Sequence, residues 1–145
     1  MDALILDTSA LFAAMTDTHP LGGQIRDVLA DAGSPPVVSP LVLAELDYLV
    51  ATRLGVAASL AVIDELTGGA YDIAGVGVDD ITAARAVIAK YADLNIGLTD
   101  AINVVLADRY GTAAIATLDQ RHFRAVTPLT SRHPAFTVLP ADVPS

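Results

Sequence analysis

The sequence contains no cysteine and few basic residues, and it has no long uncharged apolar run. The absence of cysteine excludes disulfide bridges and thiolate metal sites. A membrane-spanning helix needs a run of about 18 apolar residues, which this sequence does not contain. The amino-terminal stretch MDALILD has an acid at position 2 and only a short apolar run, which is unlike a secretory signal. We therefore expect a cytoplasmic protein that does not enter a membrane.

The charge of the chain is strongly one-sided. Lys and Arg together number 8 and Asp and Glu together number 17, which gives a formal net charge of -9. This balance argues against nucleic-acid binding through a basic surface. It suits a chain that concentrates acids to hold cations, or one that binds a basic partner, and net charge alone leaves both open.

The length of 145 residues is typical of one compact domain, so we expect a single domain over residues 1–145. Hydrophobic residues make up 53% of the chain and charged residues 17%, which is more apolar than an average soluble domain. Either the interior is large for this length or another chain covers part of the apolar surface, and we expect both.

Helical and extended patterns alternate along the chain. Short apolar runs between turn residues predict strands at residues 3–6, 37–39, 71–74, 113–117 and 136–139. Periodic segments predict helices at residues 9–15, 21–32, 40–54, 56–66, 79–93 and 99–110, and a short helical turn at 121–124. Thr8 or Ser9 is expected to cap the first helix and Thr99 the last long one. Because nearly all strand residues are apolar, we predict an α/β fold, a three-layer α/β/α sandwich with a mostly parallel sheet of four to five strands.

Four acidic residues stand out by their context. Asp7 and Asp119 each follow an apolar strand, which places them at the carboxyl edge of the sheet, where open α/β folds bind ligands. Asp100 begins a predicted helix, and Glu45 lies in a helix almost free of polar residues, where an unpaired carboxylate is costly to bury. Simpler roles exist for each: a helix cap for Asp7, a helix-dipole partner for Asp100, a turn residue for Asp119, and an exposed or arginine-paired acid for Glu45.

Together the four acids indicate one carboxylate site that needs compensating protons or cations, because converging carboxylates repel one another. Zinc is disfavoured, since cysteine is absent and the three histidines fall in loop-like segments. An all-oxygen site suits Mg2+, with Mn2+ as an alternative. Ions held in this way activate water and stabilise both oxygens of a phosphodiester displacement. We therefore predict that the catalytic and metal-binding residues are Asp7, Glu45, Asp100 and Asp119.

Four uncharged polar residues accompany these acids. Thr8, Ser9 and Thr117 are placed to orient a neighbouring acid or a water molecule on the metal. Asn103 follows Asp100 by three residues on the same helix face, where it would hold such a water without contacting the metal. Capping and turn bonding explain all four residues equally well.

Four short motifs carry a resemblance to a known family. They are DTSAL at 7–11, AEL at 44–46, LTDAIN at 98–103 and TLDQRHF at 117–123. Each string alone is weak. In this order, at this spacing and on these elements, they resemble the motifs of PIN domains, and most of all those of the VapC toxins of bacterial toxin–antitoxin pairs. The resemblance covers the whole chain.

This resemblance implies a PIN-like fold and a Mg2+-dependent endoribonuclease that hydrolyses RNA phosphodiester bonds as the toxin of a type II toxin–antitoxin pair. Asp7, Glu45 and Asp100 would be the core acids, and Asp119 a less constant fourth. In many relatives another acid falls near the position of Asn103, so the number of metal ions stays open. The resemblance also implies a VapB-like antitoxin, whose basic residue enters the acidic pocket, and a homodimer.

Arg121 and Arg124 follow Asp119 closely and are the candidate contacts for RNA phosphates. A solvated surface or an ion pair is the simpler role for either arginine. His122 is expected to be a surface residue, because a metal mechanism does not require a histidine there.

Other functions fit the sequence less well. A phosphatase of the haloacid dehalogenase type also starts with Asp after a strand, but it needs a second acid two residues later, where this chain has Ser9. A phospho-receiver domain needs a lysine after a late strand, and the single lysine, Lys90, lies within a predicted helix. The remaining alternative is a degenerate PIN-like module that binds a protein without nuclease activity, and the intact acids argue against it.

Overall fold

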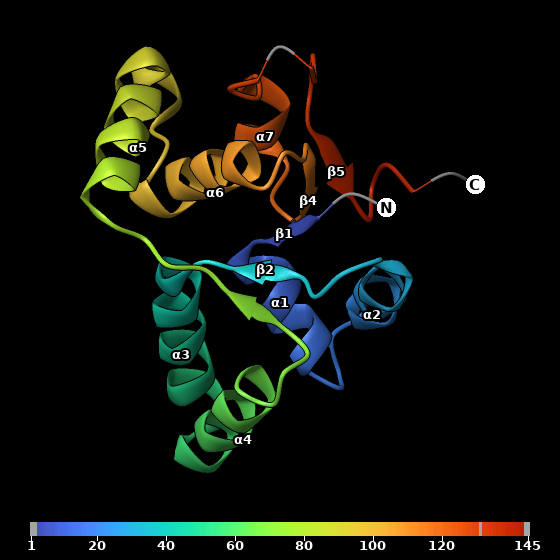
Figure 1. The fold of residues 1–145 in the computed structure, drawn as a ribbon. Coiled ribbons are helices and arrows are strands. Elements are labelled where there is room, and N and C mark those ends of the chain that lie inside the picture. Colours follow the sequence, from blue (N-terminus) through green and yellow to red (C-terminus); the bar gives the residue numbers. More distant parts are fainter. Residues whose placement is uncertain (1–2, 131, 144–145) are drawn as a thin grey trace.

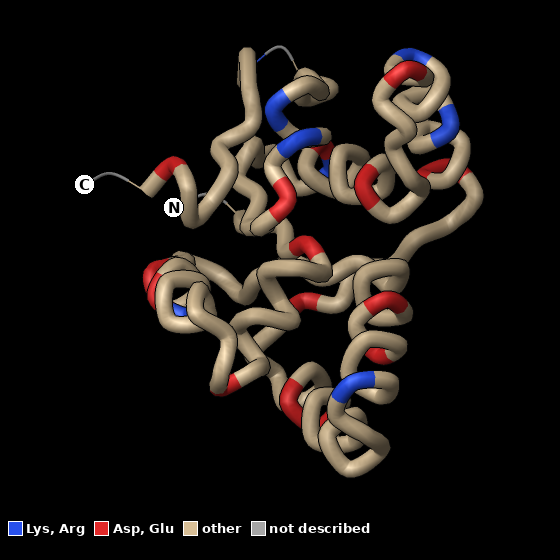
Figure 2. Tube along the Cα trace, turned by 180° about the vertical axis from the view of Figure 1, so that it is seen from behind, with Lys and Arg blue, Asp and Glu red and all other residues tan. Residues whose placement is uncertain are grey.

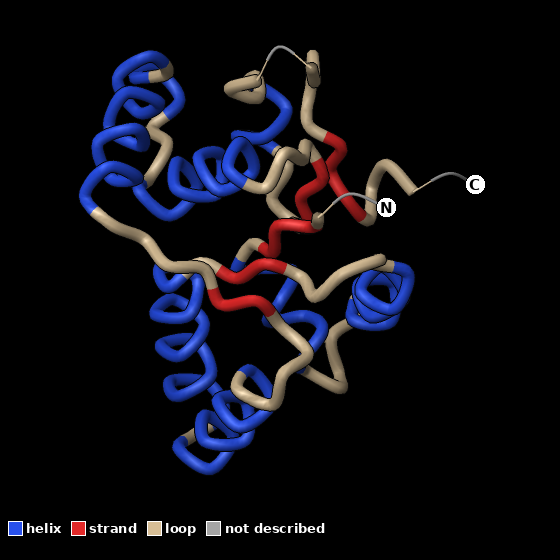
Figure 3. Tube along the Cα trace, viewed as in Figure 1, coloured by secondary structure: helices blue, strands red, loops and turns tan. Residues whose placement is uncertain are grey.

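A parallel β-sheet forms the middle of the molecule. The computed structural model describes residues 3–130 and 132–143. Within them the sheet has five strands in the order β3-β2-β1-β4-β5, and every strand pair is parallel. The strands are β1 (Leu4–Leu6), β2 (Val37–Val38), β3 (Asp72–Ile73), β4 (Ala114–Ala116) and β5 (Thr137–Leu139). Figure 3 shows them, in red, between two groups of helices.

Helices cover both faces of this sheet. On one face lie α1 to α4, and on the other lie α5 to α7 (Figure 1). The helices are α1 (Thr8–Met15), α2 (Gly22–Asp31), α3 (Pro40–Leu54), α4 (Val56–Leu66), α5 (Val78–Lys90), α6 (Leu98–Arg109) and α7 (Arg121–Ala125), and a 3-10 helix (Ala92–Leu94) precedes α6. The predicted α/β sandwich with a parallel sheet is confirmed. Among the described residues, no helix combines the length and the apolar character needed to cross a membrane.

The central strand explains why two cores form. Side chains along a strand alternate between the two faces of a sheet. Leu4 and Leu6 of β1 pack into the core beneath α1 to α4, while Ile5 packs into the core with α5 and α6. All three side chains are at most 1% exposed. A strand covered on both sides has no place for a polar side chain, and β1 contains none.

The predicted elements are present, with some ends shifted by one to three residues. The helices at 40–54 and 56–66 have the predicted bounds, because Pro40 starts α3 and Gly55, at a φ of 95°, separates α3 from α4. The predicted capping roles of Thr8, Ser9 and Thr99 are wrong. Helix α1 is capped at Asp7 and α6 at Gly97, so these three hydroxyl groups are available for other contacts.

The order of the strands determines where a ligand site can form. The chain passes from β1 to β2 on one side and later returns to β4 on the other side of β1. In α/β folds such a reversal leaves a crevice for ligands beyond the carboxyl ends of the two central strands, and we refer to this edge of the sheet as the crevice. Asp7 directly follows β1, and its backbone N–H donates to the carbonyl oxygen of Ala116 at the end of β4 (2.9 Å). Asp7 and Thr117 are therefore neighbours at this crevice.

Gly22 marks a close approach between α2 and α1. A Cβ at position 22 would lie 2.6 Å from the carbonyl oxygen of Ala13 and 2.9 Å from Nη1 of Arg26. We expect Gly22→Ala to lower the free energy of unfolding by about 1–3 kcal/mol. The matched change Gly23→Ala, whose Cβ would meet only Nη2 of Arg26 at 3.9 Å, should be neutral or stabilise by up to about 1 kcal/mol. Urea unfolding of both variants measures the difference, and equal stabilities would contradict this close approach.

Candidate active site

Asp7 is the most buried acid of the site. Its side chain is 7% exposed. Its Oδ2 accepts a hydrogen bond from the Thr117 hydroxyl (2.7 Å), and its Oδ1 accepts one from Nδ2 of Asn103 (3.4 Å). Burial and the nearby Asp100 carboxylate raise the pKa of Asp7 to about 6, and the Glu45 carboxylate adds to this effect. The ionised form of Asp7 is therefore disfavoured until a positive charge compensates it.

Asn103 lies on α6 and is fully buried, with 0% exposure. Its amide nitrogen faces Asp7, and no donor among the described residues reaches its Oδ1. A buried amide oxygen without a partner is unusual, because desolvating it without a hydrogen bond costs about 1–3 kcal/mol. This oxygen is free to accept from a water molecule or to face a cation. The sequence placed Asn103 near a water of the site, and the structure additionally makes it a donor to Asp7.

Glu45 reaches the site from α3. Contrary to the expectation of a carboxylate within an apolar helix, Glu45 is exposed. Its Oε1 accepts from the Thr8 hydroxyl (2.7 Å) and its Oε2 from the Thr99 hydroxyl (3.0 Å). These two threonines lie in the first turns of α1 and α6, so Glu45 connects three helices around the crevice. Glu45 is therefore marked as a site residue by its two hydroxyl partners and not by the cost of burying its charge.

Asp100 lies in the first turn of α6, where free backbone N–H groups favour a negative charge. Its charge contributes to the raised pKa of Asp7, so the two carboxylates lie near one another. Oδ2 of Asp100 is 2.5 Å from Nδ1 of His122, the second residue of α7. The expectation that His122 is only a surface residue is wrong, since its side chain is 18% exposed and contacts a predicted catalytic acid.

Asp119 lies at the rim of the crevice. Its side chain is 51% exposed, and its two carboxylate oxygens accept from Nε and Nη2 of Arg121 (3.3 and 3.2 Å). The hydrogen bonds from Arg121 hold the pKa of Asp119 below its usual range. The structure thus brings Asp7, Glu45 and Asp100 together and leaves Asp119 beside them, paired with an arginine.

Two hydroxyl groups connect Asp119 to the interior of the site. The Thr117 hydroxyl, which donates to Asp7, also accepts from the backbone N–H of Asp119 (3.1 Å). Ser9 lies 3.2 Å from this hydroxyl and accepts from the backbone N–H of Leu118 (2.9 Å). Thr117 therefore orients the carboxylate of Asp7 and not that of Asp119, with which the sequence associated it. Ser9 fixes the loop after β4, and Thr8 donates to Glu45 instead of Asp7.

The other candidate arginine is differently placed. Arg124 donates from Nη1 and Nη2 to Asp142 (2.8 and 2.6 Å) and from Nε and Nη2 to Gln120 (3.2 and 3.0 Å). Its guanidinium group already has partners within the chain. Arg121, with a side chain 80% exposed, is the arginine that lies beside the carboxylates.

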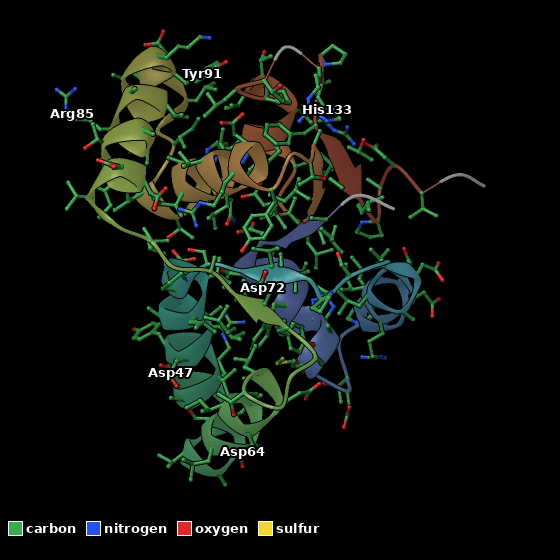
Figure 4. All side chains as sticks on the ribbon, viewed as in Figure 1. Asp47, Asp64, Asp72, Arg85, Tyr91 and His133 are labelled. Atoms are coloured by element: carbon green, nitrogen blue, oxygen red, sulfur yellow. The ribbon has the colours of Figure 1, made fainter. Side chains whose placement is uncertain are left out.

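Several acids belong to other parts of the fold. Asp47 on α3 accepts from Ser59 of α4 (2.5 Å), and Asp72 in β3 accepts from Tyr110 (3.0 Å). Figure 4 labels both, together with Asp64 on α4 and with Arg85, which projects outward from α5. Figure 2 shows acidic positions in both helical layers, with the fewer basic positions scattered among them. The site is thus distinguished by where its acids meet, not by acidity as such.

The arrangement can be compared with what a divalent cation needs. In the described ranges 3–130 and 132–143, no three acidic or histidine side chains are close enough together to bind one metal ion. Each of the other three acids has partners of its own within the chain: Glu45 is bonded to Thr8 and Thr99, Asp100 to His122, and Asp119 to Arg121. The donor chemistry nonetheless suits Mg2+, since carboxylate oxygens and an unpartnered amide oxygen lie at one crevice beside a carboxyl group whose charge is uncompensated. The residues fit the ion by chemistry, while their side chains are not assembled around one point.

Comparisons with known proteins agree with this geometry. The family described as PIN domain matches residues 4–127. Ribonuclease VapC26 of Mycobacterium tuberculosis is 49% identical over 137 residues, which cover 94% of this chain and 100% of that protein. Among solved structures, VapC20 of Mycobacterium tuberculosis, described as a sarcin-ricin loop cleaving toxin, is similar with a TM-score of 0.71 and 18% identity over 78% of this chain and 87% of its own. DNA-bound VapBC from Salmonella typhimurium is similar with a TM-score of 0.70 and 19% identity over 95% of this chain and 97% of that one. At these identities the structural similarity concerns the fold.

Proposed function

Because this chain belongs to the PIN domain family, within its VapC group, we propose that it is a Mg2+-dependent endoribonuclease and the toxin of a type II toxin–antitoxin pair. The observation that supports this most is the placement of Asp100 and Glu45 near the buried Asp7, whose charge lacks compensation. The name of the relative that is 49% identical, a ribonuclease, supports RNA as the substrate. The protein would act in the cytoplasm.

Asp7, Glu45 and Asp100 are the residues that would hold the ion, with Asp119 contributing from the rim. When bound, Mg2+ supplies an activated water and neutralises charge on the phosphodiester group during hydrolysis. The chain's own contribution is orientation. The Thr117 hydroxyl fixes Asp7, and Thr8 and Thr99 fix Glu45. Asn103 holds the other oxygen of Asp7 and keeps its own Oδ1 free for a water molecule.

RNA would approach over the rim that carries Asp119 and Arg121. The Arg121 guanidinium is exposed and its only described ion-pair partner is Asp119, so it can exchange that carboxylate for a phosphate oxygen. We retain Arg124 as a second, weaker candidate, because a phosphate would have to compete with Asp142 for its guanidinium group. The arrangement favours recognition of the phosphate backbone beside the acids and does not point to one RNA sequence.

The direct test is cleavage by the purified chain, freed of any partner, on total RNA with Mg2+ or with EDTA. We expect cleavage with Mg2+ and Mn2+, and none in EDTA, because the acids at the crevice repel a phosphate when no cation compensates them. Readdition of excess Mg2+ should restore cleavage. Activity that survives EDTA would contradict the proposal. A folded chain without activity under any of these conditions would favour the degenerate, protein-binding module instead.

A VapB-like antitoxin is the proposed protein partner. The solved relative from Salmonella typhimurium is described as VapBC bound to DNA. Between α3 and α4 of this chain lies an apolar cleft of about 350 Å³, whose walls include Leu43, Val50, Val62, Ile63 and Leu66. A cleft of this kind suits the apolar face of a partner helix, and the net charge of -9 favours a partner with basic residues.

We also propose a homodimer, since large apolar residues on the opposite layer, such as Val78 and Ile81, are exposed.

A further inference from the structure

The contact between His122 and Asp100 has no role in the cation site proposed above, which uses only the acids, the threonines and Asn103. Asp100 lies in the first turn of α6 and His122 in α7, so the contact joins two residues that are 22 positions apart in the chain. The His122 and Asp100 side chains are 18% and 23% exposed, which limits competition from water. With Asp100 ionised, the imidazole is the group that has a proton to donate, so Nδ1–H donates to Oδ2.

The first two residues of helix α7 each contact a different acid of the site. Its first residue, Arg121, pairs with Asp119, and its second residue, His122, contacts Asp100. The Asp100 carboxylate also adds to the raised pKa of Arg121, so the two charges lie in the same part of the site. By bonding Oδ2, His122 limits the rotation of the Asp100 carboxylate and engages only one of its two oxygens.

We infer that His122 is a positioning residue: its Nδ1–H holds Oδ2 of Asp100 so that the remaining carboxylate oxygen is presented to a divalent cation. This inference rests on the proposed function, because it assumes that Asp100 contributes to cation binding. A hydrogen-bond partner that orients a metal-binding side chain is typically worth about 10–100-fold in metal affinity. His122 itself is not assigned as a ligand or as an acid–base group.

The test measures binding of Mn2+ alone, by titration followed with electron paramagnetic resonance, so that no RNA or activity is involved. His122→Asn keeps a donor near the place of Nδ1, whereas His122→Leu and His122→Ala remove it at different volumes. We expect near-normal affinity for His122→Asn and about 10–100-fold weaker binding for the other two. His133→Asn, in the segment before β5 (Figure 4), is the matched control and should bind as the unaltered chain does. Circular dichroism reports whether each variant is folded.

A double substitution separates positioning from other roles. In an Asp100→Asn background, His122→Leu should cause no further loss of Mn2+ affinity, because the residue acts through Asp100. Normal binding by His122→Leu and His122→Ala would overturn the inference while leaving the proposed function intact. So would equal losses in His122→Asn and His122→Leu, since these would make the imidazole itself a ligand. If the unaltered chain binds no Mn2+, both the proposed cation site and this inference fall.

Discussion

Asp100→Asn is expected to reduce RNA cleavage by about a thousand-fold or more, and Asp7→Asn by a similar factor. An asparagine has nearly the shape of an aspartate but lacks its charge, so the change tests electrostatics more than packing. In the proposed site, Asp7, Glu45 and Asp100 would share one cation. Loss of the Asp100 charge weakens the binding of that cation, because fewer negative charges attract it. The measurement is single-turnover cleavage of labelled RNA at saturating Mg2+.

Asp47→Asn is the matched control for these two variants. Asp47 lies on the same helix as Glu45 but is hydrogen-bonded to Ser59 of α4, outside the crevice. It should cleave RNA at the rate of the unaltered chain. Cleavage at equal rates by Asp7→Asn, Asp100→Asn and the unaltered chain would point to a contaminating nuclease and would remove these acids from the mechanism.

The site could be located from sequence because it depends on topology. Asp7 follows an apolar strand, and Thr117 follows another, with the paired strands β1 and β4 bringing them together. Parallel strands place their carboxyl ends at one edge, so alternation of strands and helices already predicts that such residues are close. The motif around Asp100 adds the start of α6. None of this needs knowledge of side-chain conformation.

The roles of individual side chains were harder to predict, because they depend on rotamers and on short loops. The apolar character of α3 suggested that Glu45 is buried, yet Tyr48 on the same helix is 70% exposed and part of α3 lines an open cleft. An apolar helix indicates a core only when every apolar residue faces one, and here some face the surface. The exposure of Glu45 follows from this second apolar face.

His122 was missed for a related reason. Its contact with Asp100 exists because the five-residue helix α7 turns back toward the start of α6. A sequence pattern gives the presence of a short helical turn but not the direction in which it packs. The sequence did contain one sign of these roles, since Thr8, Thr99 and His122 each lie within three residues of a predicted acid. Each of them, however, bonds to an acid other than the one nearest to it along the chain.

Asp7→Asn is also expected to stabilise the metal-free protein at neutral pH. The pKa of Asp7 is raised from 3.8 to about 6, so between these values the folded state keeps a proton that the unfolded state has lost. The free energy of unfolding of the unaltered chain should therefore fall as the pH rises through this window, by roughly 3 kcal/mol in total. Asparagine has no such titration. At pH 7.5 in EDTA, Asp7→Asn should consequently be more stable by up to this amount, and by roughly 5–10 °C in melting temperature.

The comparison is best made between pH 4 and pH 7.5, because effects that do not depend on pH then cancel. One such effect is a change in the hydrogen bonds of Thr117. In the variant its hydroxyl would accept from the new amide of residue 7 and would donate to the carbonyl oxygen of Asp119, which is 3.2 Å away. The advantage of Asp7→Asn should be small at pH 4 and large at pH 7.5, and excess Mg2+ should reduce it by stabilising only the unaltered chain. An advantage that does not change with pH would mean that the Asp7 carboxylate is already compensated within the folded chain. In that case the reason for a cation at this crevice would disappear, because the buried charge is what the cation is proposed to neutralise.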